Sequence, residues 1–344
     1  ELRAFVARSM ARVEYIRRLE FKRRVPVTVM SREEYGGDGK GNDSAEISAY
    51  AKWNNQVWEA LFIVGETKNV QDELQQTRSA SVAGFYSIGS NQIVIITPNV
   101  SSPTISNGTL IHELTHALQD QYVNLSSPQF SARTQDGSLA IDGLIEGEAN
   151  YVEQKYSMRC GNEWSCISPP QRPNSGGSTN INLGIFLTIF QPYSDGPVYV
   201  HRLVQDQGWA SLDYSSPPNS SEQIIHVTRD PPLNVSIRDI ARNGWKPFDL
   251  GTDTVGEASI FAMFWYQSRN SQANIIDWRR ISQVQSQYDT YDYSSAPSAG
   301  WGGDAILPYH RQSNGTQQYG YIWRTQWDTR RDAEEFHSAY LSIL

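Results

Sequence analysis

Hydrophobic residues recur along the chain at two kinds of spacing, and these spacings predict which segments are helical and which are extended. Apolar side chains three or four residues apart are typical of amphipathic helices. This pattern predicts helices over these segments: 1–20, 45–63, Thr109 to Tyr122, 139–156, 183–190, 197–207 and 254–267. Runs rich in β-branched residues predict two strands, 25–30 and 92–97.

The C-terminal region has the pattern of a β-hairpin followed by a helix. Its strands are predicted over 305–309 and 318–325, with the turn at 313–315. This turn contains Asn-Gly, a pair that readily adopts the positive φ angles of a tight hairpin. A final helix is expected to begin near Asp328 or Thr329, because either side chain can cap it.

These elements predict an α+β fold. We expect a small mixed sheet packed on the two central helices, and a mostly helical second half that ends in the hairpin and its helix. The 344 residues exceed one minimal core, so we divide the chain into 1–160 and 161–344, packed together as one unit. Loops are predicted at 36–44, 98–108 and 168–180, and the Pro- and Ser-rich segment 212–236 is either a boundary or a long ordered wrap.

His112-Glu113-Leu114-Thr115-His116 is the segment with the most specific chemistry. Residues four apart share one face of a helix, so His112 and His116 can hold one cation. Zinc bound by two histidines and a carboxylate keeps a position for water and lowers the pKa of that water. Glu113 lies beside the open side and can take the proton. We therefore predict a zinc cofactor here; the alternative is a pair of polar residues on a surface helix.

A third zinc ligand is expected on the helix over 139–156, where Glu146 and Glu148 compete. The two side chains cannot both face the metal. Asn150 follows Glu146 by one turn and can hydrogen-bond a ligand imidazole, whereas Val152 follows Glu148 and cannot. This favours Glu146 as the ligand and leaves Glu148 for a salt bridge or a cap.

The net charge and the hydropathy pattern argue against nucleic acid as the main partner and against a membrane span. The formal net charge of −8 disfavours nucleic acid as the main partner. No run of 18 apolar residues occurs, so no membrane span is expected in this chain. The first helix is nevertheless rich in arginine. Such a helix can touch a membrane surface or an acidic partner, but a docked helix with a solvated basic face is favoured.

Two features indicate export to the cell surface. Cys160 and Cys166 flank a short loop and are expected to form a local disulfide. Asn-x-Ser/Thr acceptors for N-linked glycans occur at Asn42, Asn99, Asn107, Asn124, Asn219, Asn234 and Asn314. The alternatives are free thiols, and sequons that arise from a Ser- and Asn-rich composition. With 18 Tyr and 10 Trp, the chain fits an extracellular or cell-surface glycoprotein.

His-Glu-Leu-Thr-His followed some thirty residues later by a glutamate on a second helix resembles the gluzincin metallopeptidases, the thermolysin-type superfamily. The segment Leu144–Tyr151 is similar to the ligand helix of zinc aminopeptidases, where the glutamate before glycine binds the metal; this supports Glu146. The wider chain resembles a family of secreted archaeal surface proteins with this core. Segments that carry the wider resemblance include 21–27, 83–86, 191–193, 221–226, 301–304 and 327–329.

The superfamily resemblance implies further roles. The strand over 93–97 would be the sheet edge that pairs with an extended peptide. A histidine or tyrosine would stabilise the negative charge of the tetrahedral intermediate, and His226 and Tyr193 are the two candidates.

The favoured function is that of a secreted or cell-surface zinc metallopeptidase acting on peptide or protein substrates. The alternative is a catalytically silent, metallopeptidase-like glycoprotein that serves as a structural subunit of a cell surface or filament and associates with itself. Every residue type of the minimal mechanism is present, which favours the enzyme.

Overall fold

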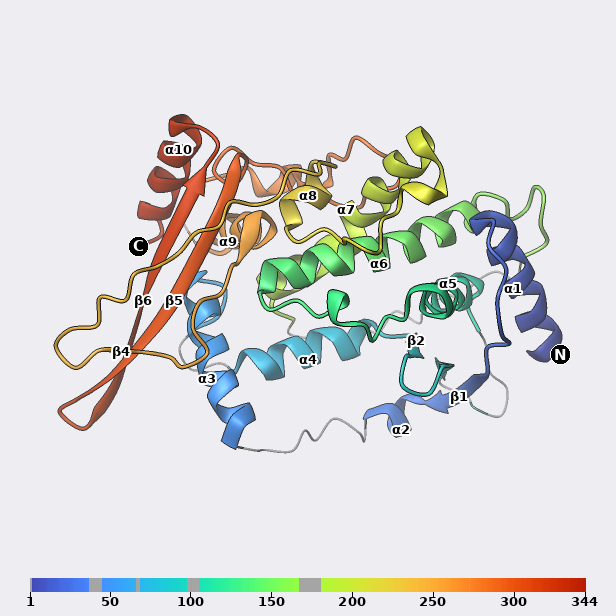
Figure 1. The fold of residues 1–344 in the computed structure, drawn as a ribbon, viewed down its shortest axis with the longest axis horizontal. Coiled ribbons are helices and arrows are strands. Elements are labelled where there is room, and N and C mark those ends of the chain that lie inside the picture. The colour runs from blue at the N-terminus through green and yellow to red at the C-terminus, as the bar shows by residue number, and fades with distance from the viewer. Residues whose placement is uncertain are drawn as a thin grey trace.

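A computed structural model describes residues 2–36, 45–65, 69–97, 100, 105–166, 181–271 and 273–344. The fold is α+β, as predicted. A small sheet lies at one end, a long hairpin lies at the other, and a layer of helices fills the space between them (Figure 1).

The small sheet contains β1 (Val27–Ser31), β2 (Gly84–Ser87) and β3 (Gln92–Thr97) in the order β1-β3-β2. β1 runs parallel to β3, and β2 runs antiparallel to it. β3 is therefore the central strand, and its prediction as a sheet edge is wrong. The two edges belong to β1 and β2, and β2 is only four residues long, too short to give a periodic signal in the sequence.

α5 (Asn107–Val123) packs on this sheet, and α1 (Leu2–Arg17) and α6 (Gln135–Ser157) pack on α5. The side chains of Ser106 and Thr134 cap the first turns of α5 and α6. Leu110, Leu114 and other apolar residues of α5 are fully buried against the sheet and α1. This packing places the His112–His116 segment between β2 and α6.

The next helix, α7 (Leu183–Gln207), is continuous, so the prediction of separate helices over 183–190 and 197–207 is wrong. Pro192 and Pro197 remove two backbone donors, which usually ends a helix. Here the burial of α7 against α6 compensates for the two lost backbone hydrogen bonds. The helices cross closely, because a Cβ on Gly196 would lie 2.5 Å from the Gly143 carbonyl oxygen and 2.8 Å from the Gly147 Cα.

The second half packs around α9 (Gly256–Asn270) and the hairpin of β5 (Trp301–Ser313) and β6 (Thr316–Trp327). α10 (Arg330–Leu341) packs on the hairpin through Phe336. The helix α3 (Ala45–Ala60) precedes residue 160, yet Trp53 and Val57 share this core with α9.

The hairpin is longer than predicted, and its turn is as predicted. Asn314 and Gly315 have φ angles of 51° and 78°, as a tight turn requires. Of the two caps proposed for the final helix, Thr329 is used, in a reciprocal arrangement with Asp332.

The remaining short elements connect these layers. They are α2 (Arg32–Gly36), α4 (Val70–Ser81), α8 (Ser221–Ile225), β4 (Lys246–Pro247) and short 3-10 turns at Pro128–Phe130, Trp209–Ser211 and Trp278–Ser282. The segment 212–236 is the ordered wrap rather than a boundary. Leu233 donates a backbone hydrogen bond to Gly302 at 2.6 Å. The predicted loop 168–180 lies outside the described residues.

Cys160 and Cys166 form the predicted disulfide. It closes the loop that follows α6. Among the described helices, none is long and apolar enough to cross a membrane.

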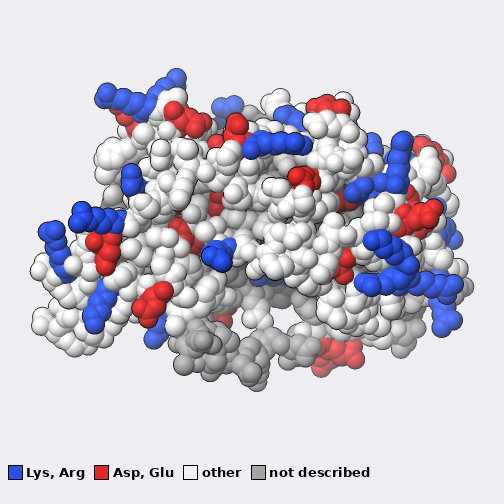
Figure 2. All heavy atoms as spheres, viewed as in Figure 1, with Lys and Arg blue, Asp and Glu red and all other residues white. Residues whose placement is uncertain are grey.

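The basic helix α1 packs against the rest of the protein, as the favoured prediction stated. Val13 and Ile16 are buried, and Arg17 forms an ion pair with Glu148 inside the protein. Most of the other basic residues in this region are exposed: Arg3, Arg8, Arg18, Lys22, Arg23 and Arg24. Lys and Arg side chains therefore gather at the end of the molecule that carries α1 (Figure 2).

A buried carboxyl group at the start of α6 makes stability depend on pH. Asp136 accepts hydrogen bonds from the Ser221 amide and hydroxyl, and its other oxygen has no partner among the described residues. Burial raises the pKa of Asp136 to about 8, despite the Ser221 hydrogen bonds and helped by the charges of Asp304 and Glu257. The folded protein thus prefers the protonated form.

Replacing Asp136 with Asn should change how stability varies with pH. A carboxyl group with a raised pKa stabilises the fold fully below its unfolded pKa of 3.8, and this stabilisation is lost as pH rises through about 8. We expect wild type to lose stability relative to Asp136→Asn between pH 4 and pH 8. Urea unfolding of both proteins across this range measures the difference, and a difference independent of pH would contradict the assignment.

Candidate metal centre

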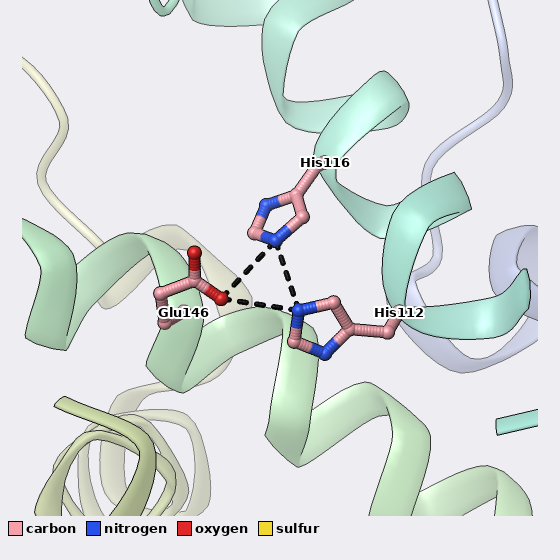
Figure 3. Close-up of side chains that lie close together, drawn as sticks. All are labelled: His112, His116 and Glu146. Atoms are coloured by element: carbon pink, nitrogen blue, oxygen red, sulfur yellow. Dashed lines mark hydrogen bonds and ion pairs between the residues drawn. The ribbon is translucent and has the colours of Figure 1, made fainter. Parts of the chain in front are cut away.

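α5 and α6 bring the three predicted ligands together (Figure 3). His112 Nε2 lies 3.0 Å from His116 Nε2 and 3.0 Å from Glu146 Oε2. His116 Nε2 lies 3.2 Å from the same oxygen. Within the described part of the chain, these three side chains are the single group of three or more His, Cys, Asp or Glu residues that could hold a metal ion.

The spacing of these atoms fits zinc. Bonds of about 2.0–2.1 Å at a tetrahedral ion place neighbouring ligand atoms about 3.3 Å apart, close to the separations seen here. Burial would raise the pKa of Glu146, but His116 and His112 outweigh this and lower it, so this ligand is ionised. The donor set of two imidazoles and one carboxylate leaves the fourth position open, as in catalytic zinc sites.

A chain of polar contacts behind His116 fixes its orientation. Gln119 Oε1 lies 2.9 Å from His116 Nδ1, while Gln119 Nε2 donates to Glu148 Oε2 at 3.0 Å and to the Ile145 carbonyl at 3.0 Å. Because the amide nitrogen is committed to these acceptors, the amide oxygen faces the imidazole. His116 therefore carries its proton on Nδ1 and presents the Nε2 lone pair to the metal. Arg17 completes the chain by pairing with Glu148.

His112 is oriented by a different residue from the one expected. Its Nδ1 lies 3.5 Å from Glu153 Oε2. Asn150, the predicted partner of a ligand imidazole, instead donates to the backbone oxygen of Tyr193 at 3.5 Å. The choice of Glu146 agrees with the geometry, but the reason based on Asn150 is wrong. Glu148 forms a salt bridge with Arg17, which is one of the two roles predicted for it.

Replacing Gln119 with Leu should weaken zinc binding about 10- to 100-fold, the usual cost of losing a residue that orients a metal ligand. The change removes the acceptor that holds His116 in its ligating tautomer. Competition with a chromophoric chelator measures the affinity. Gln121→Leu is the matched control, because Gln121 contacts the backbone of Arg23 on the surface. Equal affinities of the two variants would contradict this role.

The site opens into a cavity of about 970 Å³. His112 and Glu113 line it from α5, and Gly84 of β2 lies on its wall. Glu113 is buried, and burial raises its pKa, while the charges of His112 and His116 and the backbone N–H of Tyr86 oppose the rise. A carboxylate with a raised pKa is a stronger base, as a proton acceptor next to a metal site requires.

Tyr193 and His226 have different surroundings. Tyr193 of α7 lines the cavity and hydrogen-bonds Glu146. The charge of Glu146 and burial raise the pKa of Tyr193 well above its usual value, so the hydroxyl keeps its proton. His226 is not among the cavity residues; its Nε2 lies 2.9 Å from the buried Glu257. The prediction that His226 stabilises the oxyanion is wrong, and Tyr193 remains the candidate.

The sequons fall into three groups. Asn42 and Asn99 lie outside the described residues. Asn107 is buried, with 5% of its surface exposed, so a glycan does not fit at this position in this conformation. The side chains of Asn124, Asn219, Asn234 and Asn314 are exposed.

Comparisons with known proteins identify only the C-terminal part of the chain. Residues 246–344 match a domain family described as a domain of unknown function, DUF8575. This segment carries β4, α9, the hairpin and α10, and lies outside the metal centre. No curated protein and no solved structure matches the chain.

Proposed function

We propose that the protein is a zinc-dependent metallopeptidase that acts outside the cell or at its surface. The convergence of His112, His116 and Glu146 on one point, beside the buried Glu113, carries this proposal. The cavity is large enough for several peptide residues. The disulfide and the four exposed sequons support the location.

Each residue has a task in peptide hydrolysis. His112, His116 and Glu146 would hold zinc, which polarises the scissile carbonyl and acidifies the attacking water. Glu113 accepts a proton from that water and passes it to the leaving amine. The Tyr193 hydroxyl would turn its single proton from Glu146 to the oxygen that becomes negative in the transition state and donate a hydrogen bond to it.

The edge of β2 offers the substrate a place to pair. The Ala83 carbonyl accepts from the Ile96 amide, so it faces β3. Backbone N–H and C=O groups alternate in direction along a strand. The backbone groups of Gly84 and Tyr86 therefore point away from β3. On this side the Tyr86 amide donates a hydrogen bond to Glu113, and Gly84 lies on the cavity wall. An extended peptide can add to this edge with its scissile bond near Glu113.

Hydrolysis of a mixed peptide library, followed by mass spectrometry, tests the function. We expect cleavage by the zinc-loaded protein, loss of cleavage when a chelator removes the metal, and recovery when zinc is restored. A folded protein that retains zinc but cleaves no peptide or protein substrate would contradict the enzyme and leave the structural subunit as the better account.

A further inference from the structure

A carboxylate in the cavity has no assigned role in the proposed mechanism. Asp142 lies on α6 one turn before Glu146, so the two side chains share a face of the helix. Asp142 lines the same cavity as Glu113 and Tyr193, and its side chain is exposed. The charge of Asp142 also acts on Tyr193, which places it at the metal end of the cavity.

No positive group among the described residues forms an ion pair with this carboxylate. Arg78 and Arg133 line the cavity, and the charges of Arg78 and His116 act on Asp142 from a distance, but no described residue forms a hydrogen bond with it. The nearest ligand carboxylate, Glu146, repels it. Desolvation in the cavity and the charge of Glu146 raise the pKa of Asp142 to about 7, and the charges of Arg78 and His116 offset this rise only in part. A cation from outside would supply the missing charge.

We propose that Asp142 binds a positively charged group of the peptide substrate, about one or two residues from the scissile bond. The position follows from two lengths. Side chains four apart on a helix are about 5–6 Å from each other, and an extended peptide advances about 3.3–3.6 Å per residue. The cation is either the α-ammonium of a peptide N-terminus or a lysine or arginine side chain. This inference rests on the peptidase function proposed above.

The apolar walls of this cavity suit such a group. Leu139 of α6 and Phe186 and Phe190 of α7 line the same cavity. Apolar walls strengthen an ion pair by excluding water, and they also pack against the methylene stem of a lysine or arginine. The surface of α6 thus offers two carboxylates to the cavity: Glu153, which faces His112, and Asp142, which has no such partner.

Paired peptides test the proposal with the zinc-loaded protein. One pair differs by lysine against norleucine within two residues of the cleaved bond, and the other by a free against an acetylated N-terminus. We expect kcat/KM to be at least about tenfold higher for the cationic member of one pair. Asp142→Asn should remove this preference, measured as the ratio of the kcat/KM values of the two members of the pair. Whichever pair shows the preference identifies the source of the charge.

Ser138→Ala is the matched control, because Ser138 lies one turn earlier on the same cavity wall. This variant should keep the preference. If wild type cleaves both members of each pair equally, or if Asp142→Asn keeps the preference, the proposal is wrong while the peptidase stands.

Equilibrium binding separates this proposal from the proposed function. The same peptides are titrated into zinc-loaded Glu113→Gln, with and without Asp142→Asn. At least about tenfold tighter binding of the cationic peptide, lost with Asp142→Asn, supports the site even if no peptide is cleaved. Binding that is independent of charge would overturn the proposal.

Discussion

Glu113→Gln is expected to lower the rate of peptide hydrolysis about 100- to 10,000-fold, the usual contribution of a proton-transfer group. Gln has nearly the same shape as Glu but cannot accept a proton from water. Glu113 is buried and contacts the Tyr86 amide, and the Gln side-chain oxygen can keep that hydrogen bond. The fold and the zinc content should therefore be unchanged. Steady-state cleavage of a fluorogenic peptide measures the effect.

Glu163→Gln is the control for this prediction. Glu163 lies in the disulfide loop, pairs with Arg159 and has 59% of its side chain exposed. Glu163→Gln removes the same charge far from the predicted zinc ligands and should leave the rate of peptide hydrolysis unchanged. A Glu113→Gln protein as active as wild type would show that another group activates the water.

Glu146→Gln is expected to weaken zinc binding about 100- to 1,000-fold. A structural zinc site is worth about 10–16 kcal/mol, or about 2.5–4 kcal/mol for each of four ligands, and each 1.4 kcal/mol is a factor of ten. A neutral amide oxygen recovers little of this. Glu148→Gln should cost about tenfold, because its oxygen can still accept from Gln119 and the effect on His116 is indirect.

The order of these two affinities is the informative result. Glu148→Gln also leaves Arg17 without its carboxylate, which destabilises a partly buried charge. Affinities must therefore be compared on protein shown to be folded by circular dichroism. A larger loss of zinc in Glu148→Gln than in Glu146→Gln would reverse the assignment of the third ligand.

The metal ligands could be predicted from the sequence because their geometry is local. His112 and His116 are held on one face by the helix itself. Choosing Glu146 needed one further fact, the face of α6 that meets α5. The hairpin was predictable for the same reason, since Asn314 and Gly315 determine a turn on their own.

The residues that support the site could not be predicted in the same way. Arg17 lies 131 positions from Glu148, and no periodicity connects them. Gln119 and Glu153 carry a weak signal, because they follow ligands by three and seven residues on their own helices. The continuity of α7 through Pro192 depends on its close crossing with α6, which is a tertiary effect.

Zinc content is the measurement that tests the central claim most directly. The protein is loaded with zinc, desalted and analysed by elemental mass spectrometry, beside His116→Ala as the variant that lacks one ligand. The geometry of His112, His116 and Glu146 predicts about one zinc per chain in wild type and much less in the variant. A folded wild-type protein that retains no zinc, or a variant that retains as much as wild type, would contradict the account.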